Sequence, residues 1–162
     1  MRTFLILLFL LIASVNANAQ PKHEIRATWV TTLGGMDWPR NKATNANGIR
    51  RQQEELCQIL DQLKEANFNT VMLQTRLRGD LIYPSSIETF PEALTGRTGR
   101  NPGYDPLAFA IEEAHKRGME LHVWVNPFRV TSTGTLATSD KVWQNAGQWI
   151  IKYDNGSFSG QI

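Results

Sequence analysis

The chain has little cysteine and little histidine, and both shortages narrow the chemistry open to it. Cys57 is the only cysteine among 162 residues, so no disulfide can form within the chain and a thiolate metal centre is not indicated. The three histidines include no His-x-His pair after the first predicted strand and no pair at helical spacing, which argues against a zinc deacetylase or amidohydrolase. We therefore expect no metal site and no cofactor; zinc bound by the complete protein would revive that class.

The chain also lacks an excess of charge of either sign. It carries 17 basic and 15 acidic residues, a formal net charge of +2, and this near balance gives no reason to expect binding to nucleic acid or to an anionic membrane surface. A phosphate ligand would call for a glycine-rich loop between a strand and a helix. The tract GRTGRNPG at 96–103 has no strand before it and contains Pro102, so we reject it as a phosphate loop.

Long hydrophobic runs are absent except at the N-terminus. Arg2 precedes an apolar core at 4–13, and Ala17 and Ala19 form a small-x-small cleavage site. This core is too short to cross a bilayer as an anchor. We therefore predict a secretory signal peptide at 1–19 and a mature chain at 20–162 that is periplasmic or secreted and not inserted in a membrane. ATP and NAD are scarce outside the cytoplasm, which counts against kinases and dehydrogenases.

Apolar periodicity predicts an α/β chain in which strands and helices alternate. Strands are predicted at 25–32, from Asn69 onward and at 119–126, and helices at 49–67 and after Asp105. The second helix has Asp105 as its N-cap, Pro106 at its first position and Gly118 as its stop. This order implies a parallel sheet, and the ligands of such sheets bind at the carboxyl ends of the strands.

Two long connections join these elements. The first, at 34–48, contains Gly34, Gly35 and Pro39 and is predicted to have no regular structure. The second, at 77–104, is longer than most loops in compact domains. Its aromatic and apolar side chains predict a packed lid and not a disordered segment.

Side-chain alternation in the third predicted strand favours a barrel over a doubly wound sheet. The odd-numbered positions at 119–125 are apolar and are expected to pack on helices, so Trp124 and Asn126 face a central space that tolerates polar groups. A doubly wound sheet would bury both faces and favour uninterrupted apolar strands. In the second strand, Val71, Leu73 and Thr75 are assigned outward and Gln74 and Arg76 inward. In the first, Trp29 and Thr31 are favoured as the inward pair, with Arg26 and Thr28 as the alternative.

The predicted inner face and mouth combine aromatic, amide and charged side chains. The candidate substrate-binding residues are Trp29, Asp37, Trp38, Gln74, Arg76, Arg78, Asp80, Tyr83, Trp124, Asn126 and Arg129. Aromatic rings stack on the C–H faces of sugars, while amide, guanidinium and carboxylate groups pair with sugar hydroxyls. The set therefore suits a polysaccharide or oligosaccharide.

Some of these residues also have a purely structural interpretation. Arg76 and Asp80 could form an ion pair that closes the strand end, an interpretation as well supported as ligand contact. Trp124 could fill the core as well as face a ligand. The segment at 37–39 could be a simple turn, although Trp38 in an otherwise polar loop needs a packing partner.

Four segments of the chain resemble one known family. IRATWVTT at 25–32, MDWP at 36–39, FNTVMLQTRLRGDLIYPSS at 68–86 and GYDPLAFAIEEAHKRGMELHVWVNPFRV at 103–130 are similar to the glycosyl-hydrolase-like family 10 proteins, which are secreted bacterial (β/α)8 TIM barrels. The resemblance extends from about Glu24 to about Tyr153. It implies a TIM-barrel glycosidase that acts on a polysaccharide, with bacterial cell-wall glycan as one candidate.

The resemblance also implies that this barrel is truncated. A (β/α)8 barrel has eight strands and about 250 residues, and this chain offers the first three βα units. Glycoside hydrolysis needs two carboxylates, and the matched strand ends supply only Asp37 and Asp80, neither well placed to be the acid. We therefore expect the catalytic pair beyond residue 162 and an N-terminal part that is inactive alone. The alternative is a non-catalytic carbohydrate-binding protein on the same scaffold.

Overall fold

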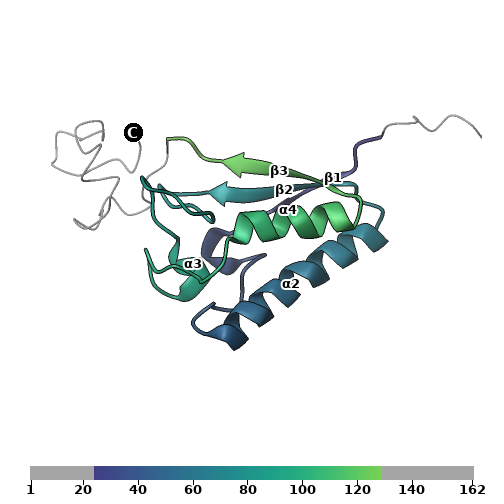
Figure 1. The fold of residues 1–162 in the computed structure, drawn as a ribbon. Coiled ribbons are helices and arrows are strands. Elements are labelled where there is room, and N and C mark those ends of the chain that lie inside the picture. The colour runs from purple at the N-terminus through teal and green to yellow at the C-terminus, as the bar shows by residue number, and fades with distance from the viewer. Residues whose placement is uncertain (1–23, 129–162) are drawn as a thin grey trace, which may run out of the picture.

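The computed structural model describes residues 24–128, and its framework is a three-stranded sheet with two long helices on one face (Figure 1). In chain order the elements are β1 (Ala27–Val30), the 3-10 helix η2 (Leu33–Gly35), α2 (Ala46–Glu65), β2 (Thr70–Arg76), α3 (Glu92–Thr95), α4 (Pro106–Lys116) and β3 (Glu120–Val125). The predicted signal peptide and the candidate Arg129 lie outside the described residues. None of the helices at 24–128 is long and apolar enough to cross a membrane.

All three strands run parallel, in the order β1-β2-β3. Trp29 lies opposite Met72 in the first pair of strands, and Gln74 lies opposite Trp124 in the second. The predicted α/β class with a parallel sheet is confirmed. The carboxyl ends of the strands therefore meet at one edge, on the side where α3 lies in Figure 1.

Both long helices begin next to a residue whose side chain caps them. The Asn45 side chain accepts a hydrogen bond from the amide of Gly48 at 2.9 Å, so α2 starts earlier than the predicted Ile49. Asp105 Oδ1 accepts from the backbone amides two and three residues later, both at 3.0 Å, and Pro106 fills the first helical position. The predicted start of α4 is confirmed.

The core lies between the sheet and the two long helices. Val71 and Leu73 of β2 are buried with apolar side chains of α2 and α4, among them Leu56, Leu60 and Ala110. This burial confirms that Val71 and Leu73 face the helices. The opposite face of β2 is the one that the sequence assigned to the inside of the expected barrel.

The apolar side of β3 is covered less than predicted. Leu121 packs against the core, but Val123 and Val125 are 54% and 42% exposed. Within residues 24–128 the helices reach Leu121 and leave these two side chains uncovered. The prediction that all the apolar side chains of this strand pack on helices is therefore wrong for Val123 and Val125 in the described part of the chain.

β1 is shorter than the predicted strand at 25–32, because side chains take over the hydrogen bonds at its end. The Thr31 amide donates to Asp37 Oδ2 at 2.8 Å, and the Thr32 amide donates to Gln74 Oε1 at 3.1 Å. These acceptors replace the ladder of main-chain bonds. The strand consequently ends at Val30.

Both connections contain short regular elements. The first includes η2, where Gly34 and Gly35 have φ angles of 62° and 77°, so the prediction of no regular structure at 34–48 is wrong at this point. The connection at 77–104 contains α3 and buries Ile82 and Leu94. Its predicted packing is confirmed.

Candidate functional site

Two tryptophans meet on the face of the sheet opposite the helices. The indoles of Trp29 in β1 and Trp124 in β3 lie edge to face, with ring centroids 5.0 Å apart and an interplanar angle of 84°. Trp29 is 60% exposed, whereas its neighbour Val30 is buried in the core. Trp29 therefore points away from the helices, as favoured from the sequence. We name Trp29 and Trp124 the aromatic platform.

Asn126 borders the aromatic platform and is held through three of its polar groups. Its Oδ1 accepts a hydrogen bond from Trp124 Nε1 at 3.1 Å. Its backbone amide donates to the carbonyl of Arg76 at 3.1 Å, and its own carbonyl accepts from Arg76 Nη1. Trp124 and Asn126 thus form one unit at the end of β3, and their predicted placement together is confirmed.

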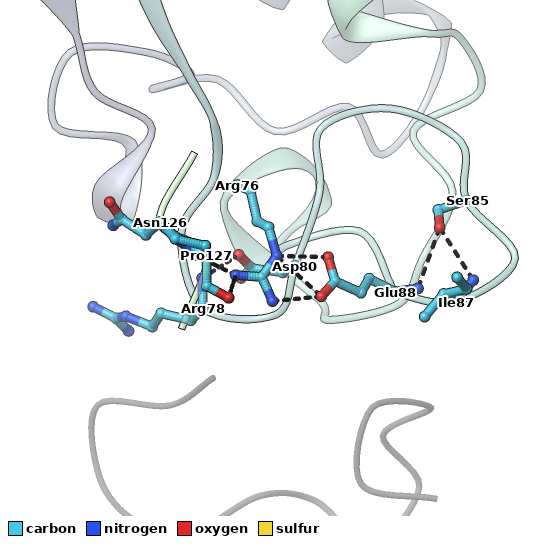
Figure 2. A network of polar contacts seen from close by, with 8 residues as sticks. All are labelled: Arg76, Arg78, Asp80, Ser85, Ile87, Glu88, Asn126 and Pro127. Atoms are coloured by element: carbon cyan, nitrogen blue, oxygen red, sulfur yellow. Dashed lines mark hydrogen bonds and ion pairs between the residues drawn. The ribbon is translucent and has the colours of Figure 1, made fainter. Parts of the chain in front are cut away.

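The Arg76 side chain joins the end of β2 to the connection at 77–104. Its Nε lies 3.0 and 2.9 Å from the two carboxylate oxygens of Glu88, and its Nη2 lies 2.5 Å from Glu88 Oε1. Figure 2 shows the two side chains pointing toward one another. Of the two interpretations left open for Arg76, the ion pair with Asp80 is wrong, because Glu88 supplies the carboxylate.

Sequence reasoning missed Glu88 altogether. A carboxylate twelve residues after Arg76, across an irregular connection, leaves no periodic signal. The only available signal was chemical. An arginine that is buried at the end of a strand needs a hydrogen-bond acceptor for its guanidinium. Every carboxylate of the following connection was therefore a candidate partner for Arg76.

Gln74 ties the ends of β1 and β2 together. Its Oε1 accepts from Thr31 Oγ1 at 2.6 Å and from the Thr32 amide, and the whole residue is only 1% exposed. Because its carbonyl oxygen is already occupied, Gln74 acts on the site by shaping the strand ends. Its predicted direct contact with substrate finds no support in this geometry.

A polar cavity of about 250 Å³ lies beside the carboxyl ends of β1 and β2. Its walls include Thr32, Lys42, Thr75, Arg78, Asp80 and Glu92. The Arg78 amide donates to Asp80 Oδ1 at 3.0 Å, while Arg78 Nε is buried and has no hydrogen-bond partner among the described residues. Burial raises the pKa of Asp80, and hydrogen bonds from the backbone amides of Arg78 and Leu77 oppose that shift. Two predicted site residues thus lie in this cavity.

Asp37 and Trp38 serve the fold of their connection. Trp38 is fully buried, and its Nε1 donates to the carbonyl of Gln52 in α2 at 2.9 Å. Asp37 accepts the Thr31 amide, which caps the end of β1. The prediction that Trp38 lines a cleft is wrong, because the partner this tryptophan needed is the core and not a ligand.

Tyr83 is the last of the candidate residues that the structure describes. Tyr83 is half-buried in the connection at 77–104 and does not line the cavity. In the part of the chain that the structure describes, no group of three or more His, Cys, Asp or Glu side chains could hold a metal ion. The candidates that lie together are thus Trp29, Trp124, Asn126 and Arg76, with Arg78 and Asp80 in the cavity nearby.

The sequence of the chain is similar to those of known glycosyl hydrolases. The chain is similar to Glycosyl hydrolase YngK of Bacillus subtilis (strain 168), with 38% identity over 142 residues, or 86% of this chain and 27% of that protein. It is also similar to Glycosyl hydrolase DigH of Escherichia coli (strain K12), with 39% identity over 131 residues, or 76% of this chain and 29% of that protein. The chain therefore spans less than a third of the length of either relative. The family model for Glycosyl hydrolase-like 10 matches residues 24–158, and the chain belongs to this family.

Proposed function

We propose that the complete protein hydrolyses O-glycosidic bonds of a polysaccharide, and that residues 24–128 form one wall of its substrate cleft. The observation that carries this proposal is the aromatic platform, where Trp29 is 60% exposed on the inner face of a parallel sheet. Indole rings offer sugars a flat apolar surface, and Asn126 beside them offers hydrogen bonds to hydroxyls. Membership of the glycosyl hydrolase-like 10 family supports the same substrate class.

The scaffold we infer is a (β/α)8 barrel of which this chain supplies the first three βα units. Three observations support it: the strands are parallel and sequential, the helices cover one face, and aromatic and polar groups occupy the other. In such barrels the active site forms at the carboxyl ends of the strands. The aromatic platform and the cavity lie toward that edge.

The catalytic carboxylates belong, in this proposal, to segments that follow residue 162. Three of the carboxylates near the site already have a structural partner: Asp37 accepts the Thr31 amide, Asp80 accepts the Arg78 amide, and Glu88 binds Arg76. Glu92 is a further carboxylate in the wall of the cavity. The relatives are more than three times as long as the matched region, which leaves ample chain for an acid and its partner. Hydrolysis requires two such groups flanking the scissile bond.

Cell-wall glycan is the substrate we favour, because the N-terminal sequence predicts export from the cytoplasm. The test is release of reducing sugars by the complete protein from bacterial peptidoglycan, with plant and algal glycans compared in parallel. Release from peptidoglycan alone supports the proposal. Release from none of the glycans contradicts it.

A variant of the platform gives a sharper test. Trp124→Ala removes the ring that contacts Trp29 and the donor that binds Asn126, so we expect glycan affinity to fall about tenfold, the loss of one good aromatic contact. Isothermal titration with a soluble oligosaccharide measures it. Val123→Ala is the matched control, because Val123 precedes Trp124 in β3 but lies on the opposite face. Equal loss in both variants would contradict the platform.

The second candidate function is carbohydrate binding without hydrolysis. The observation in its favour is that Asp37, Asp80 and Glu88 are all engaged by other groups. Glycan binding by the complete protein, with no release of reducing ends during prolonged incubation, would decide for this alternative.

A further inference from the structure

The Arg76 guanidinium is a junction between two segments that are distant in sequence. On one side it binds the Glu88 carboxylate through Nε and Nη2, and on the other its Nη1 donates to the carbonyls of Asn126 and Pro127 (Figure 2). The Arg76 and Glu88 side chains are only 10% and 14% exposed. Charge-assisted bonds of this kind are strong and directional when they are shielded from water.

The junction leads directly to the aromatic platform. Arg76 binds both backbone groups of Asn126. The Arg76 carbonyl accepts a hydrogen bond from the Asn126 amide, and the Arg76 guanidinium donates to the Asn126 carbonyl. The Asn126 side chain in turn accepts from Trp124 Nε1 at 3.1 Å, and Trp124 contacts Trp29. Four consecutive contacts thus connect the Glu88 carboxylate to the exposed indole of Trp29.

We propose that Glu88 is a positioning residue for the aromatic platform, acting through Arg76 and Asn126 on the orientation of Trp124. This inference rests on the proposed function, because it assigns the platform the task of binding sugar. Both Glu88 carboxylate oxygens are engaged by Arg76, so Glu88 orients the sugar-binding ring without touching substrate. Without Glu88, the shielded guanidinium loses its counter-charge and no longer holds the Asn126 carbonyl in place.

The backbone on the N-terminal side of Glu88 is fixed by the side chain of Ser85. Ser85 Oγ accepts hydrogen bonds from the amides of Ile87 at 3.1 Å and Glu88 at 3.3 Å. This small turn sets the direction in which the Glu88 side chain leaves the backbone. Ser85→Ala is therefore a milder perturbation that keeps the carboxylate and loosens only its support.

The chain provides a matched control in a second shielded ion pair. Glu113 and Arg117 lie on and just after α4 with side chains 13% and 16% exposed, close to the values for Glu88 and Arg76. Their contacts lie on the helix side, with Asp61, Lys116 and Cys57. Glu113→Gln therefore removes a comparable ion pair that has no connection to the aromatic platform.

The first experiment is spectroscopic and requires no catalysis. Two indoles 5.0 Å apart couple in the ultraviolet, and the difference between wild type and Trp124→Phe in the circular dichroism of the complete protein isolates this signal. We expect Glu88→Gln to abolish most of the coupled signal, Ser85→Ala to reduce it, and Glu113→Gln to leave it unchanged. An unchanged signal in both Glu88→Gln and Ser85→Ala overturns the positioning role.

The second experiment separates positioning from general stability. With an oligosaccharide substrate, Glu88→Gln should raise KM by roughly three- to tenfold with kcat nearly unchanged, the pattern of lost ground-state binding. In a Trp124→Ala background the same substitution should have no further effect, because residues acting through one group are not additive. Full additivity overturns the proposal. If the wild-type protein hydrolyses no glycan, the proposed function fails instead, while the dichroism still tests the link to Trp124.

Discussion

At the scale of the single residue, the burial of Asp80 beside the cavity disfavours the charged form of its carboxyl group. Burial is the largest influence on this carboxyl and raises its pKa, while the amides of Arg78 and Leu77 and the charge of Arg78 act in the opposite direction. The net shift is upward, so the folded protein holds the proton more tightly than the unfolded chain does. Between the ordinary pKa and the raised one, stability therefore falls as pH rises.

This sign predicts the effect of Asp80→Asn. The amide keeps an oxygen that can accept the Arg78 amide and removes the charge that burial disfavours. We expect the variant to be more stable than wild type at pH 7. At pH 3 the Asp80 carboxyl of the wild type is mostly protonated, so the two proteins should differ little in stability. Urea unfolding of the complete protein at the two pH values measures this difference.

Asp61 supplies a control of opposite sign. A hydrogen bond from Arg117 lowers the pKa of this surface carboxyl, so its contribution to stability is present above the ordinary pKa and is lost as the solution becomes acidic. Asp61→Asn should therefore destabilise at pH 7 and not at low pH. The same response in both variants would contradict the assignment of burial as the dominant influence on Asp80.

Single residues also show where sequence reasoning reached its limit. Trp29 and Trp38 flank the end of β1, yet one is 60% exposed and the other is fully buried. Trp29 belongs to a strand, so the period of two reduced its facing to two alternatives, Trp29 with Thr31 or Arg26 with Thr28, and the favoured one agrees with the structure. Trp38 stands in an irregular connection, where no period indicates whether a large ring meets the core or a ligand.

The elements that could be predicted carry their signals locally. Two adjacent residues determine the start of α4: Asp105 caps the helix and Pro106 fits its first turn. The connection at 77–104 is different, because its shape depends on long-range contacts such as the Arg76–Glu88 pair and the bridge between Asp80 and Thr89. Its packing could be predicted from apolar content, but its path could not.

The cap of α4 gives a prediction at this scale. Asp105→Ala removes the acceptor for two backbone amides, each 3.0 Å from Asp105 Oδ1, and should lower the free energy of unfolding by about 1 kcal/mol. Asp105→Asn keeps an acceptor at the same position and should lose much less. Thermal unfolding of the two variants beside wild type measures the difference. Equal losses would show that the cap bond is not the source of the effect.

At the scale of the whole molecule, the helices of residues 24–128 cover one face of the sheet, and on β3 they cover it only in part. The helices cover Val71 and Leu73, while Trp29 on the opposite face and Val123 and Val125 on the helix side of β3 keep large exposed fractions. In the proposed barrel, further strands pair with the outer edges and further helices cover β3. The alternation in β3 was the sequence feature that favoured a barrel, and the facing of Trp124 agrees with it.

This exposure predicts how a polypeptide of these 162 residues behaves by itself. Within residues 24–128, β1 and β3 each have one edge without a neighbouring strand. Such edges beside exposed apolar side chains favour association between chains, so we expect concentration-dependent oligomers in sedimentation velocity and no release of sugar from any glycan. Val123→Lys places a charge on the helix side of β3, where Val123 is 54% exposed, and should reduce the association. A monomer that unfolds in one sharp transition would contradict the proposed barrel, because it would show that three strands and their helices need no further strands to complete the fold.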